Sequence, residues 1–290
     1  MSEWSFIAID QSSLSHLYTL HEAVYNKPAR PGYYHEKYDT AYTGAQPVGY
    51  IALQNDCPAA CCSAIPYRVS VQGKTILAAQ LCDGMTHPAH RHKGLFLQVI
   101  NRIVAMTREQ GIHFLFGFPN QNSYPAFIKH LDFTHAQTMN RYTFTFGDSL
   151  YKKIYRRLIS SVPGQATITN PLLQEGYDGL IYDADLIKYR RYNMNCIRQI
   201  NEAAVWMNRS GDRIIGAVSI AASLDDLLRY LKKKEKAASA TFIISSGAQL
   251  DGALSSRTRP QPGFEVITKN LSGRYQLDKL KFQFADLDIF

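Results

Sequence analysis

The residues with the clearest chemical potential lie in residues 86–96, which read THPAHRHKGLF. Arg91, His92 and Lys93 place basic side chains directly before Gly94, where an amphipathic helix is predicted to begin. The first N–H groups of a helix have no partner within it and carry the positive end of its dipole. Glycine has no Cβ and lets a ligand approach the backbone closely. The segment therefore predicts an anion site, most often for phosphate. The alternative is an exposed turn without a ligand.

The segments after this loop predict the elements that would position it. Apolar residues after Gly94 fall mostly on one helical face, and Gly111 is a signal for the end of that helix. The apolar run at 112–118 predicts a buried strand, and 124–131 predicts a short helix. A last strand is predicted over 136–146. The segment thus predicts the order strand, anion loop, helix, strand, helix, strand.

This loop resembles the pyrophosphate loop of the GNAT superfamily of acyl-CoA N-acyltransferases. The family pattern has Gln or Arg, two free positions, Gly, one free position, and then Gly or Ala. Arg91 and Gly94 match it, and Thr86-His87-Pro88 stands in for the Val-x-Pro segment that commonly precedes the loop. Phe96 departs from the last small position. The resemblance spans about residues 80–146 and implies an α/β protein with a mixed sheet and the acyl-CoA N-acyltransferase fold.

The resemblance also implies a cofactor and its site. In the family, the strand before the loop splays from its neighbour, and its backbone pairs with the pantetheine arm of CoA. The implied cofactor is acetyl-CoA as acyl donor, and no metal is expected. The implied cofactor-binding residues are Met85, Thr86, His87, Arg91, His92, Lys93, Gly94, Leu95 and Phe96.

Acyl transfer to an amine requires that the amine lose a proton and that the leaving thiolate gain one. Asp83, near the end of the strand before the loop, is the candidate base; the alternative is that it forms a turn with Gly84. In many family members a tyrosine protonates the thiolate, but Ile128 occupies that position here. Tyr124, one turn earlier, is the substitute, and its alternative is packing at the helix start. Asn120 could instead hydrogen-bond near the thioester.

Further residues are candidates for the acceptor side. In GNAT proteins the region after the first helix helps to line the acceptor site, so Tyr33, Tyr34 and Tyr38 could face substrate. The alternative is a packing flap of amphipathic tyrosines. His87 and His90 are alternative bases, and so is the carboxylate at the chain terminus.

Composition limits the class of protein. A chain of 290 residues favours two domains, and its 46% hydrophobic and 19% charged residues are ordinary for a folded soluble protein. No apolar run is long enough to span a membrane, and the N-terminus is not a secretory signal, so a cytoplasmic location is expected. The five cysteines lack paired CxxC spacing, which argues against a disulfide framework or a zinc site.

The net charge of +8 has several possible meanings: nucleic-acid binding, an anionic cofactor, or solubility alone. Most basic residues are scattered, and no aromatic residues follow a basic sheet pattern. Nucleic acid is therefore not the expected partner. The expected partner is a small-molecule amine or a peptide amine.

The chain is expected to contain two GNAT-like units. We expect a GNAT domain over residues 1–148, a connecting helix over 149–166 and a degenerate GNAT-like domain over 167–290. The second unit has no Arg-x-x-Gly loop before its helix, so no CoA is expected there. The leading hypothesis is an acetyl-CoA-dependent N-acetyltransferase that works by direct attack in a ternary complex. The alternatives are a non-catalytic CoA-binding or regulatory protein, and an aminoacyl-tRNA-dependent transferase.

Overall fold

A computed structural model describes residues 3–149, 151, 167–193, 195–208, 212–219 and 223–289. The chain divides into two compact units, and each takes segments from distant parts of the sequence. Unit 1 consists of Met1–Val69, Lys74–Ala136 and Val266–Gln276, and unit 2 of Ser70–Gly73, Gln137–Glu265 and Leu277–Phe290. This division differs from the expected boundaries at 148 and 167, because the chain changes units within three of its strands. The expected connecting helix lies almost wholly outside the described residues.

The sheet of unit 1 starts as an antiparallel meander. β1 (Ser5–Ala8) pairs with β2 (Val48–Gln54), and β2 pairs with β3 (Cys57–Val71). β4 (Lys74–Thr86) follows next to β3. The sequence also predicts an antiparallel meander before the loop, and the structure confirms it. Its last strand leads directly into residues 87–94.

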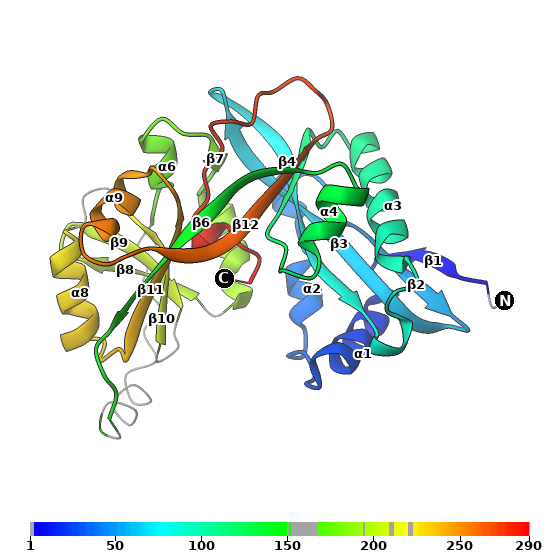
Figure 1. The fold of residues 1–290 in the computed structure, drawn as a ribbon, viewed down its shortest axis with the longest axis horizontal. Coiled ribbons are helices and arrows are strands. Elements are labelled where there is room, and N and C mark those ends of the chain that lie inside the picture. Colours follow the sequence, from blue (N-terminus) through cyan, green and yellow to red (C-terminus); the bar gives the residue numbers. More distant parts are fainter. Residues whose placement is uncertain are drawn as a thin grey trace. The chain divides into compact units, whose positions relative to one another are not determined.

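A parallel pair completes the positioning of the loop. β4 runs parallel to β5 (Phe114–Gly117), and α3 (Leu95–Glu109) connects them. α3 contacts β2 and β4 and buries its apolar stripe against them (Figure 1). The amphipathic helix and the buried strand expected from the sequence are both confirmed, because hydrophobic period alone specifies them.

Three further helices belong to unit 1. α1 (Leu14–Tyr25) contacts β4 and α2 (Tyr33–Lys37). α4 (Tyr124–His130) follows β5 and inserts Phe127 into the same core as α3. The strands of unit 1 thus share one apolar core with α3 and α4, whereas α1 and α2 contact β4 separately.

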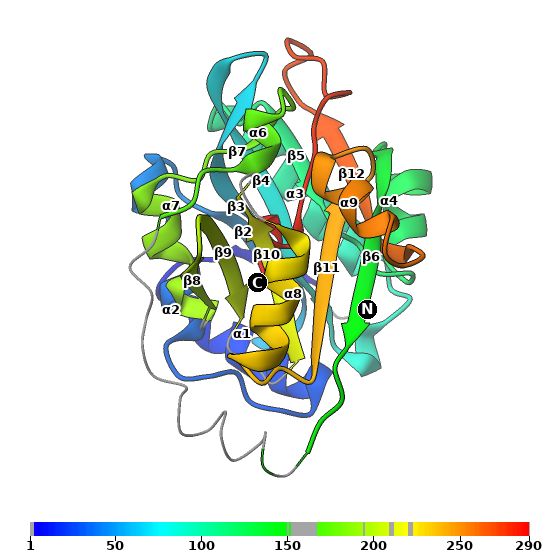
Figure 2. The same ribbon diagram turned by 90° about the vertical axis from the view of Figure 1, so that its left-hand side faces the viewer.

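Unit 2 contains a second parallel pair around a helix. β8 (Asn195–Ile200), β9 (Ala203–Asn208) and β10 (Asp212–Val218) form an antiparallel meander. β10 then runs parallel to β11 (Ser239–Ser245), and α8 (Leu224–Lys233) connects them and contacts β11 (Figure 2). The remaining described elements of this unit include α6 (Pro171–Gln174), β7 (Gly179–Leu180), α7 (Ala184–Tyr189) and α9 (Gln249–Ser255).

Besides β3, whose last two residues belong to unit 2, two long strands give residues to both units. β6 (Thr134–Thr145) follows α4 in the chain, but its residues 139–145 pair with β11 in unit 2. β12 (Gln261–Asn270) follows α9, but its residues 267–270 pair with β5 in unit 1. The strand predicted at 136–146 therefore exists, yet it is not the neighbour of β5. Chain order alone would suggest that β6 pairs with β5, since consecutive strands usually lie side by side.

The sequence also predicts a strand over residues 281–284, and this prediction is wrong. Residues 281–284 do not form a strand: Gln283 makes an isolated bridge with Ile244, and Phe284–Asp286 is a 3₁₀ helix. The cause is local, because the carboxylate of Asp286 accepts a hydrogen bond from the backbone N–H of Gln283 at 2.7 Å and turns the chain. Within the described ranges, no helix is both long and apolar enough to cross a bilayer.

Candidate functional site

β4 continues past the point at which β5 ends. The parallel register ends with Leu81 opposite Gly117, whereas β4 extends to Thr86. The other edge of β4 stays attached to β3, because the N–H of His87 donates to the carbonyl of Ala59 at 2.8 Å. The edge of β4 that faces β5 therefore extends beyond its hydrogen-bonded pairing with β5, which ends at Leu81. An open strand edge of this kind can pair with an extended, amide-containing ligand.

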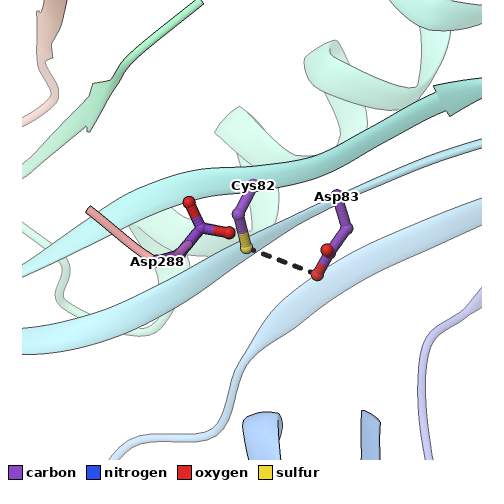
Figure 3. A group of neighbouring side chains, drawn as sticks. All are labelled: Cys82, Asp83 and Asp288. Carbon is purple, nitrogen blue, oxygen red and sulfur yellow. Dashed lines mark hydrogen bonds between the residues drawn. The ribbon is translucent and has the colours of Figure 1, made fainter. Parts of the chain in front are cut away.

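The backbone of β4 is irregular at this same place. Asp83 has a φ of 52°, in the left-handed region that aspartate tolerates better than most residues. Asp83 and Gly84 lie within β4 rather than in a turn, and the irregularity brings the side chains of Cys82 and Asp83 together (Figure 3). The Sγ of Cys82 lies 3.6 Å from Oδ2 of Asp83. Gly84 faces α3, since a Cβ there would lie 3.3 Å from the ring of Phe96.

The carboxylate of Asp83 is held from three sides. The Nζ of Lys37, at the end of α2, lies 2.7 Å from Oδ1. The hydroxyl of Tyr38 donates to Oδ2 at 2.8 Å, and the Oγ of Ser63 lies 3.3 Å from the same oxygen. The side chain of Lys37 is 1% exposed and that of Asp83 is 11% exposed. The site therefore contains a nearly buried ion pair whose carboxylate is the more accessible partner.

The tyrosines expected near the acceptor have mixed roles. Burial raises the pKa of Tyr34 and of Tyr38, and the nearby charge of Asp83 raises both further, so both remain hydrogen-bond donors. The hydroxyl of Tyr34 lies 2.9 Å from Nδ1 of His21, whose pKa is lowered mainly by burial. The Nζ of Lys37 lies 5.5 Å from the ring centroid of Tyr33. Tyr38 thus contacts the candidate base, while Tyr34 packs behind it.

The basic loop has the backbone of an anion site. His92 and Gly94 both have left-handed φ values, 64° and 71°. Gly94 is the N-cap of α3 and provides no side-chain cap, and a Cβ at Gly94 would meet no atom within 4 Å. Arg91, His92, Lys93 and Gly94 are exposed. The first turn of α3 is therefore accessible to a ligand, with basic side chains beside it.

The side chains of His87, His90 and Lys93 make contacts within the loop region. The Nζ of Lys93 lies 3.3 Å from Nδ1 of His90 and 5.6 Å from the ring centroid of Trp4. Burial, Lys93 and His87 lower the pKa of His90, so this ring is neutral near pH 7. His87 itself accepts a hydrogen bond from the N–H of Ala89 at 3.2 Å. The contacts of His87 and His90 therefore help to shape the loop.

Three of the implied cofactor residues contribute their side chains to packing. Met85 and Leu95 are buried. The ring of Phe96 packs at the edge of the unit 1 core, edge to face with Phe127 at 5.5 Å. Their backbone groups, rather than their side chains, are what the loop offers to a ligand. Phe96 therefore points into the protein and not into the anion loop.

Asn120 and Tyr124 lie at the start of α4. The Oδ1 of Asn120 accepts from the backbone N–H groups of Asn122 and Ser123, at 2.9 and 3.1 Å, and so shapes the turn before the helix. Tyr124 is partly buried against the core, and its ring centroid lies 6.0 Å from that of His135. These contacts are separate from those of Asp83, so the predicted catalytic residues form two groups.

The sequence reasoning missed Lys37 and Ser63. Lys37 lies 46 residues before Asp83, so no local pattern links the two. One signal was available: Lys37 lies between Tyr34 and Tyr38 in a tyrosine-rich segment. A lysine among amphipathic rings is a candidate for a buried charge, and buried lysines almost always have a partner.

Comparison with known proteins agrees with this geometry. Residues 5–136 match a family model described as an acetyltransferase (GNAT) domain. Among curated proteins, no sequence matches the chain. The structure is similar to a GCN5-related N-acetyltransferase from Kribbella flavida, with a TM-score of 0.63 and 12% identity over 93% of this chain and 73% of that one.

Two other solved structures show the same fold. A putative acetyltransferase from Pyrococcus horikoshii has a TM-score of 0.59 and 12% identity, over 98% of this chain and 94% of that one. The Saccharomyces cerevisiae N-myristoyltransferase, solved with myristoyl-CoA, has a TM-score of 0.56 and 10% identity, over 96% of this chain and 84% of that one. Residues 5–136 thus match a GNAT acetyltransferase domain model, and the chain has the mixed α/β fold of these solved structures.

Proposed function

We propose that this protein is an acetyl-CoA-dependent N-acetyltransferase that acylates a small-molecule or peptide amine by direct attack in a ternary complex. The observation that carries the proposal is the end of β4. Its edge leaves β5 after Leu81, and it leads into an exposed basic loop at the uncapped start of α3. Both features lie in the part of the chain that matches the GNAT family model.

The residues present fit an acyl-CoA donor. The left-handed positions at His92 and Gly94 turn the loop, and Arg91 and Lys93 can neutralise a pyrophosphate beside it. The backbone of residues 85–87 can pair with the amides of a pantetheine arm. When bound, acyl-CoA supplies the acyl group as an activated thioester.

Residues of this chain carry out the proton transfers that accompany attack by the amine. Asp83 receives at its carboxylate the proton that the attacking amine loses, since it is the more exposed member of its ion pair. The hydroxyl of Tyr124 donates a proton to the departing thiolate, and Asn120 keeps the turn before α4 in place. Proton transfers of this kind are typically worth about 10²- to 10⁴-fold in rate.

Unit 2 is, in this proposal, a degenerate GNAT-like unit that binds no CoA. Two observations support a second unit: β10 and β11 are parallel around α8, as β4 and β5 are around α3, and the similar structures cover nearly the whole chain. The segment before α8, residues 219–223, reads SIAAS and has neither a basic residue nor a glycine. It therefore lacks the groups that would hold a pyrophosphate.

The first experiment is calorimetric titration with acetyl-CoA of the native protein, Gly94→Glu and Gly111→Glu. Gly111 is the matched control, because it lies just beyond the other end of α3, has a similar φ of 74°, and has equally open surroundings. The cost of a left-handed side chain, about 1–2 kcal/mol, is therefore the same in both variants. We expect Gly94→Glu to lose binding and Gly111→Glu to retain it.

The second step is a screen of amines with release of free thiol as the readout. Turnover with any amine supports the transferase. Binding without turnover by any amine would favour the non-catalytic CoA-binding protein. Equal binding of acetyl-CoA by both glutamate variants would show that the acyl donor does not bind at this loop. Competition by acyl-CoA esters of increasing length, up to the myristoyl ester that the yeast neighbour holds, determines the preferred acyl chain.

A further inference from the structure

The ammonium group of Lys37 is held in an unusual place. Its side chain is 1% exposed, and its Nζ lies 2.7 Å from Oδ1 of Asp83. Removal of a lysine from water is unfavourable unless a well-placed anion compensates. Asp83 is that anion, and it lies on the irregular segment of β4 where the strand leaves β5. The pair therefore joins the end of α2 to the functional end of β4.

The groups that face Asp83 come from four elements. Lys37 and Tyr38 approach its two carboxylate oxygens from the end of α2, and the Oγ of Ser63 approaches from β3. Within unit 1, burial raises the pKa of Cys61, Tyr34 and Tyr38 and lowers that of His21, so these four groups carry no charge near pH 7. The Sγ of Cys82 lies 3.6 Å from Oδ2 of Asp83, and Cys61 donates to the backbone carbonyl of Asp83. Lys37 provides the positive charge in direct contact with this carboxylate.

We propose that Lys37 is a positioning residue for acyl transfer, which holds the carboxylate of Asp83 oriented as the proton acceptor for the amine. The inference rests on the proposed function. Its physical basis is that a cation at 2.7 Å favours the charged form of a carboxylate. With Lys37 on Oδ1 and Tyr38 on Oδ2, the accessible carboxylate has a fixed orientation and a positive charge in direct contact with it.

The test is the pH dependence of kcat/KM for the best amine from the screen, in the native protein, Lys37→Met and Lys37→Arg. Loss of the positive charge favours the neutral carboxylic acid, so the acidic limb of the Lys37→Met profile should move to higher pH. We expect kcat/KM near neutral pH to fall about 10- to 100-fold. The Kd for acetyl-CoA should not change. Lys37→Arg keeps the charge and should restore the position of the acidic limb.

Lys27→Met is the matched control, because Lys27 is exposed near the end of α1 and has no part in the proposed site. Its profile should match that of the native protein. An acidic limb that does not move in folded Lys37→Met would overturn the inference while the transferase stands. A native protein that turns over no amine would overturn the proposed function itself, before any variant is made.

Lys37→Met can also fail to fold, and the double variant Lys37→Met/Asp83→Asn decides that case. The double variant keeps the shapes of both side chains and removes both charges. Recovery of the native thermal midpoint would show that the unpaired Asp83 carboxylate caused the failure, which supports the pairing. Failure of the double variant as well would show that Lys37 is needed for packing, and would overturn the inference.

Discussion

The ring of Phe96 occupies space that a side chain on Gly84 would need. A Cβ at Gly84 would lie 3.3 Å from Cε2 of Phe96, and Phe96 also packs edge to face against Phe127. The bulky side chain of Phe96 is thus accommodated by the glycine at position 84 on β4. A substitution at one position has consequences at the other, since packed interiors leave few voids.

We expect Gly84→Val to lower the free energy of unfolding by about 1–3 kcal/mol, because it overpacks the contact with Phe96. In a Phe96→Ala background the same substitution should cost much less. Urea unfolding of the four proteins in this double-mutant cycle measures the coupling. Additive effects of the two substitutions would contradict direct packing between these residues.

At the scale of elements, the C-terminal segment of unit 2 is held by buried polar contacts. Phe282 exchanges hydrogen bonds with Ser245, and the hydroxyl of Tyr182 donates to Oδ1 of Asp286 at 2.7 Å. A guanidinium nitrogen of Arg190 donates to the carbonyl of Asp286 at 2.9 Å. Burial raises the pKa of Asp286 from 3.8 to about 6, although Tyr182, Gln283 and Arg190 each lower it.

This raised pKa makes the stability of the segment depend on pH. Between pH 3.8 and about 6, the folded protein keeps a proton on Asp286 that the unfolded chain has lost, so stability falls as pH rises. We expect the native protein to lose about 3 kcal/mol relative to Asp286→Asn as pH rises from about 4 to about 7. Urea midpoints across this range provide the measurement. The exposed Asp278→Asn is the control, and its curve should run parallel to that of the native protein.

At the scale of the whole molecule, each unit obtains a central strand from a distant part of the chain. β5 of unit 1 pairs with residues 267–270 of β12, and β11 of unit 2 pairs with residues 139–145 of β6. Val266 and Ile267 are both fully buried. The order of elements that defines unit 1 therefore requires β12, although about 120 residues separate β12 from the rest of that unit.

We expect a fragment of residues 1–148 not to fold cooperatively, because β5 lacks its neighbour and the burial of Val266 and Ile267 is lost. Each of these side chains contributes about 1.5–3 kcal/mol when buried. A chain that joins residues 1–136 through a flexible Gly/Ser linker to residues 261–276 should fold cooperatively. Thermal unfolding followed by circular dichroism compares the two. A sharp transition in the 1–148 fragment would contradict the need for β12.

The local elements could be predicted because their signals lie within a few residues. The period of α3 and its start at Gly94 depend on contacts within one helical turn. The sequence left two alternatives for Asp83, the end of the strand before the loop or a turn with Gly84. The choice between these alternatives, and the partner Lys37, could not be found from local signals. Both depend on which strand and helix meet in the folded chain.

The sequence by itself determined a basic glycine loop at the start of an amphipathic helix, followed by a buried strand and a short helix. Those features arise from hydrophobic period, backbone freedom and local charge. Only the tertiary structure decided which strand pairs with β5, and that Lys37 holds Asp83. The favoured pairings of strand edges and buried charges are those that leave the fewest backbone groups and charges without partners in the folded chain. These pairings do not depend on how far apart the partners lie in the sequence.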